Sequence, residues 1–225
     1  MRDDGRRFME REGRGYLFEN IDAVIFDMDG VVTSSARAHA AAWKKMFDEY
    51  LKERSRRTQE RYVPFDDHRD YLRYIDGKPR YEGVQSFLES RGISLDFGNT
   101  DDPPGKETVC GLGNLKNQYF RKHLQEYGAE PYQSTVDFVR FLKGRGIRVA
   151  VISASRNARA VMEAAGVQGL FEEAVDGVDS ARLGLRGKPA PDPYLIAAKA
   201  FGVAPERCLV FEDSEIGAEA AYLAG

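Results

Sequence analysis

Short apolar runs recur along the chain at wide intervals. The first lies at residues 21–26 between turn-forming residues, and similar runs lie at residues 147–152 and 208–211. Apolar runs of this length are typical of strands that are buried on both faces. We therefore predict three strands of a buried parallel sheet at these positions.

Amphipathic stretches separate the later strands. Their apolar positions predict helices over residues 134–143, 157–165 and 192–201, and a glycine follows each stretch as a stop signal. Strands and helices that alternate in this way favour βαβ units. We therefore expect an α/β fold whose core is a doubly wound, Rossmann-like parallel sheet with helices on both faces.

The long segment between the first and second strands must hold a structure of its own, because a plain loop of that length is rare. Its pattern is mainly helical. In its first helix, a histidine and three aromatic residues recur at spacings that place them on one stripe: His39, Trp43, Phe47 and Tyr50. The pattern predicts a helical domain inserted after the first strand.

Two more helices are predicted in this segment, over residues 82–90 and 115–127. The Gly-, Pro- and Asp-rich residues 96–113 between them predict a loop. Before the first strand, arginines mixed with acids show no apolar periodicity, which is typical of a flexible, solvated arm. The domains that we expect are an arm at 1–20, an α/β core at 21–34 and 132–225, and a helical cap at 35–131.

Charge and composition exclude several classes of protein. Lys and Arg number 33 against 36 Asp and Glu, and this net charge of −3 argues against a nucleic-acid binder. The apolar runs are too short to cross a bilayer, and the N-terminus lacks the apolar region of a signal peptide. We therefore expect a cytoplasmic, monomeric protein that does not bind membranes. Cys110 and Cys208 have neither disulfide-scaffold nor zinc-ligand spacing.

Candidate chemistry begins at the end of the first strand, with Asp27 and Asp29. In an open parallel sheet, ligands bind beyond the carboxyl ends of the strands, so both carboxylates should face that site. Two acids one residue apart imply a bound cation or one protonated carboxyl group. Asp-Gly is also a common turn dipeptide, so a pair of turn acids is the alternative interpretation.

Later strand ends carry further polar groups. Ser153 and Ser155 offer hydroxyls that suit phosphate oxygens or a plain helix N-cap. Lys188 lies beside two prolines just before a helix, which favours a positioned charge over a solvated one. Glu212 and Asp213 repeat the acids of the first strand, again with an N-cap as alternative. Because these strand ends meet at one edge of the sheet, we predict a hard-cation site with phosphate-binding groups beside it. The predicted metal site comprises Asp27, Asp29, Glu212 and Asp213, and Ser153 and Lys188 serve the phosphate.

The segments DMDGVV, SAS, GKPAPD and FEDS together resemble the four motifs of the haloacid dehalogenase (HAD) superfamily, and more closely its β-phosphoglucomutase-like family. The resemblance covers roughly residues 21–225. It implies phosphoryl transfer through an aspartyl-phosphate, with Asp27 as nucleophile and Asp29 as general acid/base. It also implies Mg²⁺ bound by Asp27, the Asp29 backbone carbonyl and Asp213, with Glu212 beside the ion.

The predicted cap contains weaker matches to the same family. Arg80 resembles an arginine that grips the distal phosphate, although surface charge in a turn is equally compatible with it. His39 and Lys116 match positions that couple cap closure to catalysis, although a histidine on an apolar stripe is commonly a core residue. The substrate-binding set that we expect is His39, Trp43, Arg80, Lys116, Ala154, Arg156 and Asn157.

The chain also departs from the family. Residues 33–35 read Thr-Ser-Ser where the family often has Thr-Asp-Thr, and the cap is longer around residues 55–67 and 96–113. The chain stops at Gly225, whereas family members normally continue through at least one more strand. We therefore expect either a fragment or a short sheet.

Three functions are compatible with these motifs. We expect a Mg²⁺-dependent phosphatase of small sugar phosphates, because the altered hinge and the enlarged cap favour a hydrolase. The first alternative is a β-phosphoglucomutase that interconverts β-glucose 1-phosphate and glucose 6-phosphate, which His39, Arg80 and Lys116 favour. The second is a non-catalytic sugar-phosphate-binding module. The presence of both Asp27 and Asp29 argues against such a module, because binding alone needs neither a nucleophile nor an acid.

Overall fold

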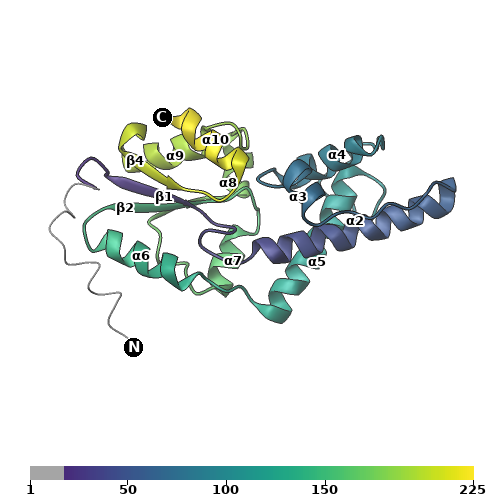
Figure 1. The fold of residues 1–225 in the computed structure, drawn as a ribbon, viewed down its shortest axis with the longest axis horizontal. Helices are drawn as coiled ribbons and strands as arrows, with labels where there is room; N and C mark the ends of the chain where they lie inside the picture. The colour runs from purple at the N-terminus through teal and green to yellow at the C-terminus, as the bar shows by residue number, and fades with distance from the viewer. Residues whose placement is uncertain (1–17) are drawn as a thin grey trace.

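A computed structural model describes residues 18–225 of the chain. These residues form an elongated molecule of two lobes, one built around a sheet and one made of helices (Figure 1). Most of the arm expected at residues 1–20 lies outside the described range. Residues 18–20 form a turn, and the ring of Phe18 packs against Phe138 at 6.4 Å between centroids.

In the described part of the chain, one parallel sheet has the strand order β3-β2-β1-β4. Its strands are β1 (Ala23–Asp27), β2 (Arg148–Ile152), β3 (Glu173–Val175) and β4 (Cys208–Phe211). The three predicted strands are confirmed as β1, β2 and β4, and β2 and β4 flank β1 on either side. β3 was not predicted, because a strand of three residues is too short to form a recognisable apolar run.

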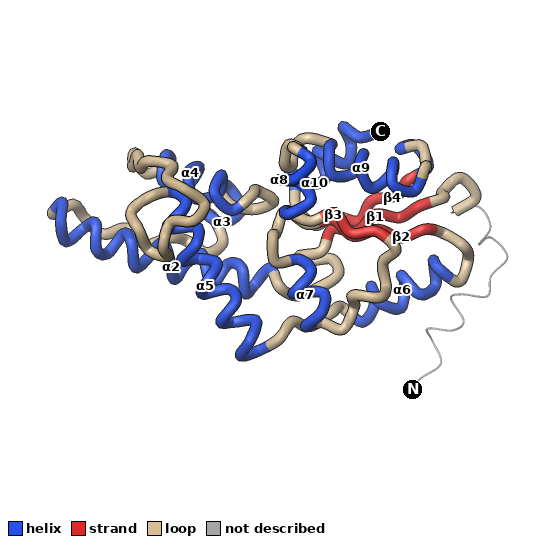
Figure 2. The backbone as a smooth tube through the Cα atoms, turned by 180° about the vertical axis from the view of Figure 1, so that it is seen from behind, coloured by secondary structure: helices blue, strands red, loops and turns tan. Residues whose placement is uncertain are grey.

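Helices cover both faces of the sheet, as Figure 2 shows from behind. One face carries α6 (Gln133–Lys143) and α7 (Ala158–Ala164), and the other carries α9 (Asp192–Phe201) and α10 (Glu215–Ala224). Side chains of β1 alternate between the two faces. Val24 and Phe26 pack on the side of α6 and α7, whereas Ala23 and Ile25 pack on the side of α9 and α10. The predicted doubly wound α/β fold is confirmed.

The second lobe is helical and has a hydrophobic core of its own. It comprises α2 (Ala36–Thr58), α3 (Arg69–Tyr74), α4 (Arg80–Ser90) and α5 (Val109–Tyr127). The predicted stripe on α2 is buried, and Phe47 packs against Phe87 at 4.2 Å between ring centroids. α3 was not predicted. No helix within residues 18–225 is both long and apolar enough to span a bilayer.

The predicted loop at residues 96–113 is wrong in its last part, because α5 already begins at Val109. The hydroxyl of Thr108 caps this helix by accepting the amide hydrogen of Gly111 at 3.0 Å. The glycines near the start of this helix are typical of a loop, which is why the sequence predicted one here. They are needed for packing, since a Cβ at Gly111 would overlap the backbone of Lys106.

Two chain segments join the lobes side by side. The amide of Ser34 donates to the carbonyl of Glu130, and the amide of Tyr132 donates to the carbonyl of Val32, each at 2.9 Å. The remaining helix of the sheet lobe, α8 (Gly177–Leu183), lies near the junction (Figure 1). The carboxyl ends of the strands point toward the helical lobe, which therefore covers the edge where ligands bind in such sheets.

Candidate active site

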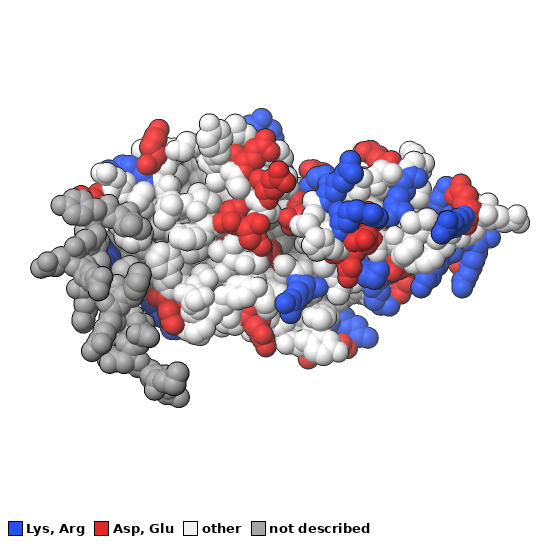
Figure 3. Space-filling model, viewed as in Figure 1, with Lys and Arg blue, Asp and Glu red and all other residues white. Residues whose placement is uncertain are grey.

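A cavity of about 90 Å³ lies between the two lobes, beyond the carboxyl ends of β1 and β4. On the visible face, acidic side chains gather on the sheet lobe beside the junction and basic ones on the facing helical lobe (Figure 3). Twelve of the predicted site residues line this cavity: Asp27, Asp29, His39, Trp43, Arg80, Lys116, Ala154, Arg156, Asn157, Lys188, Glu212 and Asp213. Ser153 does not line it, but its hydroxyl donates a hydrogen bond to Asp29 Oδ2 at 3.1 Å.

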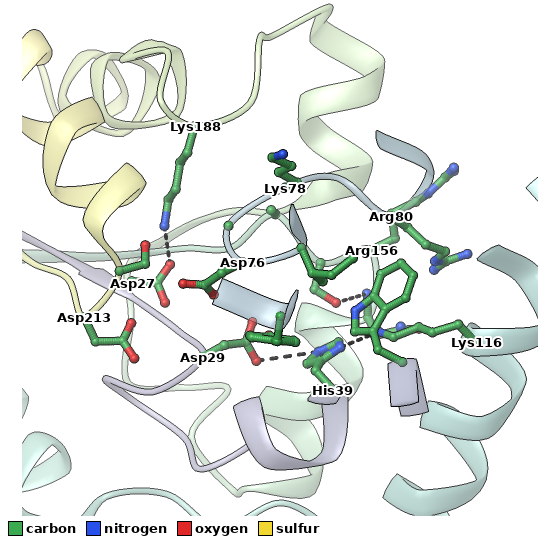
Figure 4. Close-up of a pocket in the computed structure, with 18 of the residues that line it drawn as sticks. Asp27, Asp29, His39, Asp76, Lys78, Arg80, Lys116, Arg156, Lys188 and Asp213 are labelled. Atoms are coloured by element: carbon green, nitrogen blue, oxygen red, sulfur yellow. Dashed lines mark hydrogen bonds and ion pairs between the residues drawn. The ribbon is translucent and has the colours of Figure 1, made fainter. Parts of the chain in front are cut away.

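Asp27, the last residue of β1, is buried and pairs with Lys188 (Figure 4). The Lys188 ammonium lies 2.5 Å from Asp27 Oδ1 and 2.6 Å from Glu212 Oε2. Glu212 is held in turn by the hydroxyls of Tyr194 and Ser214, at 2.5 and 2.7 Å. Lys188 is therefore a fixed charge beside Asp27.

The charges of these groups depend on one another. Burial raises the pKa of Asp27 well above its usual range, and the ammonium of Lys188 opposes this rise. Burial alone would lower the pKa of Lys188, but the carboxylates of Asp27 and Glu212 raise it instead. Burial would also raise the pKa of Glu212, but Lys188 lowers it. Lys188 is thus protonated at neutral pH and favours the anionic form of Asp27.

The same strand ends fit a hard divalent cation. Asp27, Glu212 and Asp213 each offer an oxygen atom within 4.8 Å of the other two. Gly30 lets Asp213 come close, because a Cβ at this position would overlap Asp213 Oδ2. Lys188 alone cannot neutralise three carboxylates, so this donor set suits Mg²⁺, which prefers oxygen ligands. The Asp29 carboxylate is not part of this cluster.

Asp29 points instead toward hydroxyl groups and a histidine. Its Oδ1 accepts a hydrogen bond from Ser35, and its Oδ2 accepts one from Ser153 at 3.1 Å. Burial raises the pKa of Asp29, and both serines oppose the rise. A carboxyl group with a raised pKa can hold a proton and give it to a leaving group. Ser35 lies in the segment that departs from the family, so the segment still supplies a polar partner.

His39 and Lys116 extend this chain of contacts into the helical lobe. His39 Nε2 lies 3.7 Å from Asp29 Oδ1, and its Nδ1 lies 2.6 Å from the Lys116 ammonium. Burial lowers the pKa of Lys116 to about 7 and that of His39 well below its usual range. The neutral imidazole therefore accepts a hydrogen bond from Lys116 and directs its Nε2 hydrogen toward Asp29. Trp43 packs under the Lys116 ammonium at 4.9 Å.

The opposite wall of the cavity carries two guanidinium groups. Arg80 donates to Asn117 Oδ1 at 3.0 Å, and Asn157 donates to the same oxygen at 2.7 Å. Burial lowers the pKa of Arg80, and the positive charge of Arg156 lowers it further. Among residues 18–225, neither guanidinium forms an ion pair with a carboxylate. This wall is therefore suited to a second anion, across the cavity from Asp27.

Asp76 is a cavity residue that the sequence reasoning missed. It lies in the helical lobe directly before the Gly-Lys-Pro-Arg segment and faces Asp27 and Asp213 in Figure 4. Burial, followed by repulsion from Asp213 and Glu212, raises the pKa of Asp76 to about 6. Its only sequence signal was its position beside that segment, since nothing local shows that it meets acids of the other lobe.

This repulsion predicts a pH-dependent gain in stability for Asp76→Asn in the absence of metal ions. The raised pKa means that folded Asp76 carries an unfavourable charge above pH 6, whereas below the unfolded pKa of 3.8 both states are neutral. Because solvent screens a partly exposed group, we expect about 1 kcal/mol, or roughly 2–4 °C in Tm, at pH 7.5. The gain should disappear near pH 4. Thermal unfolding in EDTA measures it, with the exposed Asp101→Asn as control.

Comparison with known sequences identifies relatives over nearly the whole chain. The family of haloacid dehalogenase-like hydrolases matches residues 21–225. A β-phosphoglucomutase of Mycobacterium bovis is 45% identical over 204 residues, which cover 91% of this chain and 78% of that protein. A fructose-1-phosphate phosphatase of Escherichia coli is 28% identical over 210 residues, which cover 93% of this chain and 95% of that protein.

A solved structure agrees with these sequence matches. The crystal structure of a β-phosphoglucomutase from Clostridium difficile has a TM-score of 0.70 and 25% identity. The match covers 91% of this chain and 81% of that one. Both lobes therefore have counterparts in a solved protein.

Proposed function

Because the chain belongs to the haloacid dehalogenase-like hydrolase family, whose phosphohydrolase and phosphomutase members are its relatives, we propose that it transfers phosphoryl groups of small sugar phosphates through Asp27. The resemblance read from the four motifs is confirmed, and the chain is an enzyme of this class. The proposal assigns the chemistry to the residues of the cavity between the lobes.

Asp27 is the nucleophile in this proposal. Its carboxylate bonds to phosphorus as the bond from phosphorus to the sugar oxygen breaks, which leaves an aspartyl-phosphate. Two anions must approach each other in this step. Lys188, at 2.5 Å from Asp27, reduces their repulsion and favours the ionised carboxylate against the effect of burial.

Mg²⁺ would be held by Asp27, Glu212 and Asp213, together with the Asp29 backbone carbonyl, and it would supply charge neutralisation for the phosphate oxygens.

Asp29 handles the proton. The departing sugar oxygen is a strong base, and the raised pKa of Asp29 lets this carboxyl group donate a proton to it. In the second half of the reaction Asp29 takes the proton back from the hydroxyl group that attacks the aspartyl-phosphate. His39 and Lys116 reach Asp29 from the helical lobe, so Asp29 has its full set of partners only when the lobes are together.

The second anion site favours a mutase over a simple phosphatase. A mutase must hold a sugar bisphosphate with one phosphate at Asp27 and the other elsewhere, and Arg80 and Arg156 offer that second place across the cavity. This observation carries the proposal that the chain isomerises a sugar phosphate of the β-glucose 1-phosphate type. The phosphatase favoured by the altered hinge is the second candidate, and the E. coli relative supports it.

Arg80→Ala separates the two candidates. In a mutase, loss of this partly buried guanidinium removes a charge-assisted contact made in every turnover, so isomerisation should fall by about ten- to a hundredfold or more. Release of inorganic phosphate should fall less than about tenfold, because hydrolysis needs only the site at Asp27. Both products are measured in parallel on a panel of hexose phosphates.

The exposed Arg73→Ala, a cation of the same lobe that does not line the cavity, is the control and should leave both rates unchanged. Release of phosphate with no isomerised product from the unmodified protein, and a loss of that release of less than about tenfold in Arg80→Ala, would make the phosphatase the better assignment.

A further inference from the structure

A second cavity, of about 260 Å³, adjoins the first between the two lobes. Its walls are mainly apolar. The helical lobe contributes Pro79, Tyr81 and Phe97, and the sheet lobe contributes Ala181 and Leu185. The proposed phosphoryl transfer gives this cavity no role.

Glycines allow the walls of this second cavity to lie close to their neighbours. A Cβ at Gly113 would lie 2.7 Å from the ring of Tyr81, and one at Gly187 would lie 3.0 Å from Pro79 of the other lobe. Tyr81 is also fixed by its hydroxyl, which donates to Asn114 Oδ1 at 3.0 Å. Phe97 meets the Tyr81 ring edge-on at 6.0 Å between centroids. The aromatic wall is thus held in place by packing and hydrogen bonds.

The inner end of the second cavity is positively charged. Arg80, Arg156 and Lys188 line both cavities, so they form the partition between the apolar walls and Asp27. Phe97, one of the apolar wall residues, is 53% exposed. A ligand that fits this lining has an anionic group at the partition and an apolar ring against Phe97 and Leu185.

We propose that the second cavity is an accessory subsite for the ring of phosphate esters whose organic part is aromatic. An apolar cavity of about 150 Å³ is enough to bind benzene, so 260 Å³ admits a fused pair of rings. The inference rests on the proposed chemistry at Asp27. As Asp27 bonds to phosphorus, the bond to the aryl oxygen breaks, and that oxygen takes the proton of Asp29. Water then attacks phosphorus and gives a proton back to Asp29, and the bond from phosphorus to Asp27 breaks to free phosphate and the Asp27 carboxylate.

Binding of two phosphonates, which have no ester bond to cleave, tests the subsite. Isothermal titration of the full chain with Mg²⁺ should give a dissociation constant for 2-naphthylmethylphosphonate about tenfold or more below that of methylphosphonate. Ala181→Phe fills the cavity from an exposed helix position and should remove this difference while leaving methylphosphonate binding unchanged. Inorganic phosphate should compete with both phosphonates.

Two further variants serve as a control and as a second test of the cavity wall. Ala200→Phe, the same change at an exposed alanine of α9 that does not line the cavity, should bind both phosphonates normally. Phe97→Ala removes one wall at a half-exposed position and should weaken only the naphthyl ligand. The subsite would be overturned if Ala181→Phe still bound 2-naphthylmethylphosphonate more tightly than methylphosphonate by the same factor. It would also be overturned if inorganic phosphate did not displace the two phosphonates.

Hydrolysis of acetyl phosphate separates this inference from the proposed function. If the protein hydrolyses acetyl phosphate but binds 2-naphthylmethylphosphonate no more tightly than methylphosphonate, the subsite is overturned and the chemistry at Asp27 is not affected. Ring-dependent binding without turnover of acetyl phosphate or 2-naphthyl phosphate would overturn the proposed function, and with it the assignment of the ligand as a substrate.

Discussion

Asp27→Asn is expected to abolish phosphoryl transfer, with a loss on the order of 10⁴ or more. An amide nitrogen cannot take the place of the carboxylate oxygen that bonds to phosphorus, so no covalent intermediate forms. The fold should survive, because the amide is isosteric, burial disfavours the charge that it removes, and Lys188 still pairs with Glu212. Phosphate release and isomerisation of hexose phosphates measure the loss, and thermal unfolding verifies the fold.

Asp29→Asn is the matched variant for this experiment. It lies two residues away and lines the same cavity, but it acts on the proton, so its loss should slow transfer by a factor on the order of 10². A smaller loss in Asp27→Asn than in Asp29→Asn would contradict the assignment of the nucleophile.

Removal of Mg²⁺ is expected to abolish activity and to lower stability. Asp27, Glu212 and Asp213 repel one another at the strand ends, and a divalent cation relieves this repulsion only in the folded protein. At about 100 times its dissociation constant, Mg²⁺ should stabilise the chain by about 2.7 kcal/mol, or roughly 5–10 °C in Tm. Thermal unfolding with and without EDTA reads this shift independently of turnover.

Asp213→Asn should remove most of the Mg²⁺-dependent shift in Tm, because it takes a charged ligand from the cluster. Asp101→Asn, an exposed acid of the helical lobe, should keep the full shift. A shift that persists in Asp213→Asn would place the cation elsewhere.

The core of the site could be predicted because its residues follow strands. Asp27, Ser153 and Asp213 each come at or just after an apolar run, and strands of a parallel sheet bring their carboxyl ends to one edge. The apolar runs predicted the strands, and the parallel topology predicted that the residues at their carboxyl ends lie close together. Local sequence therefore carried enough information for this part of the site.

The start of α5 and the strand β3 could not be predicted in the same way. Val109 opens a helix whose first turn holds glycines, and these residues are set by what packs against them rather than by helix propensity. β3 is held by pairing with β2, in register from Ala150 with Glu173 to Ile152 with Val175. Three residues hold too little pattern to reveal such a partner.

The sequence by itself determined the α/β core, the inserted helices and the strand-end acids, because these depend on local periodicity and on the rules of parallel sheets. Only the tertiary structure decided that Lys116 reaches Asp29 through His39, that Asp76 faces the acids of the other lobe, and that an apolar cavity lies beyond Arg80. These contacts join residues far apart in the chain. They depend on how two separately packed cores lie against each other. The local pattern of polar and apolar residues does not specify this arrangement.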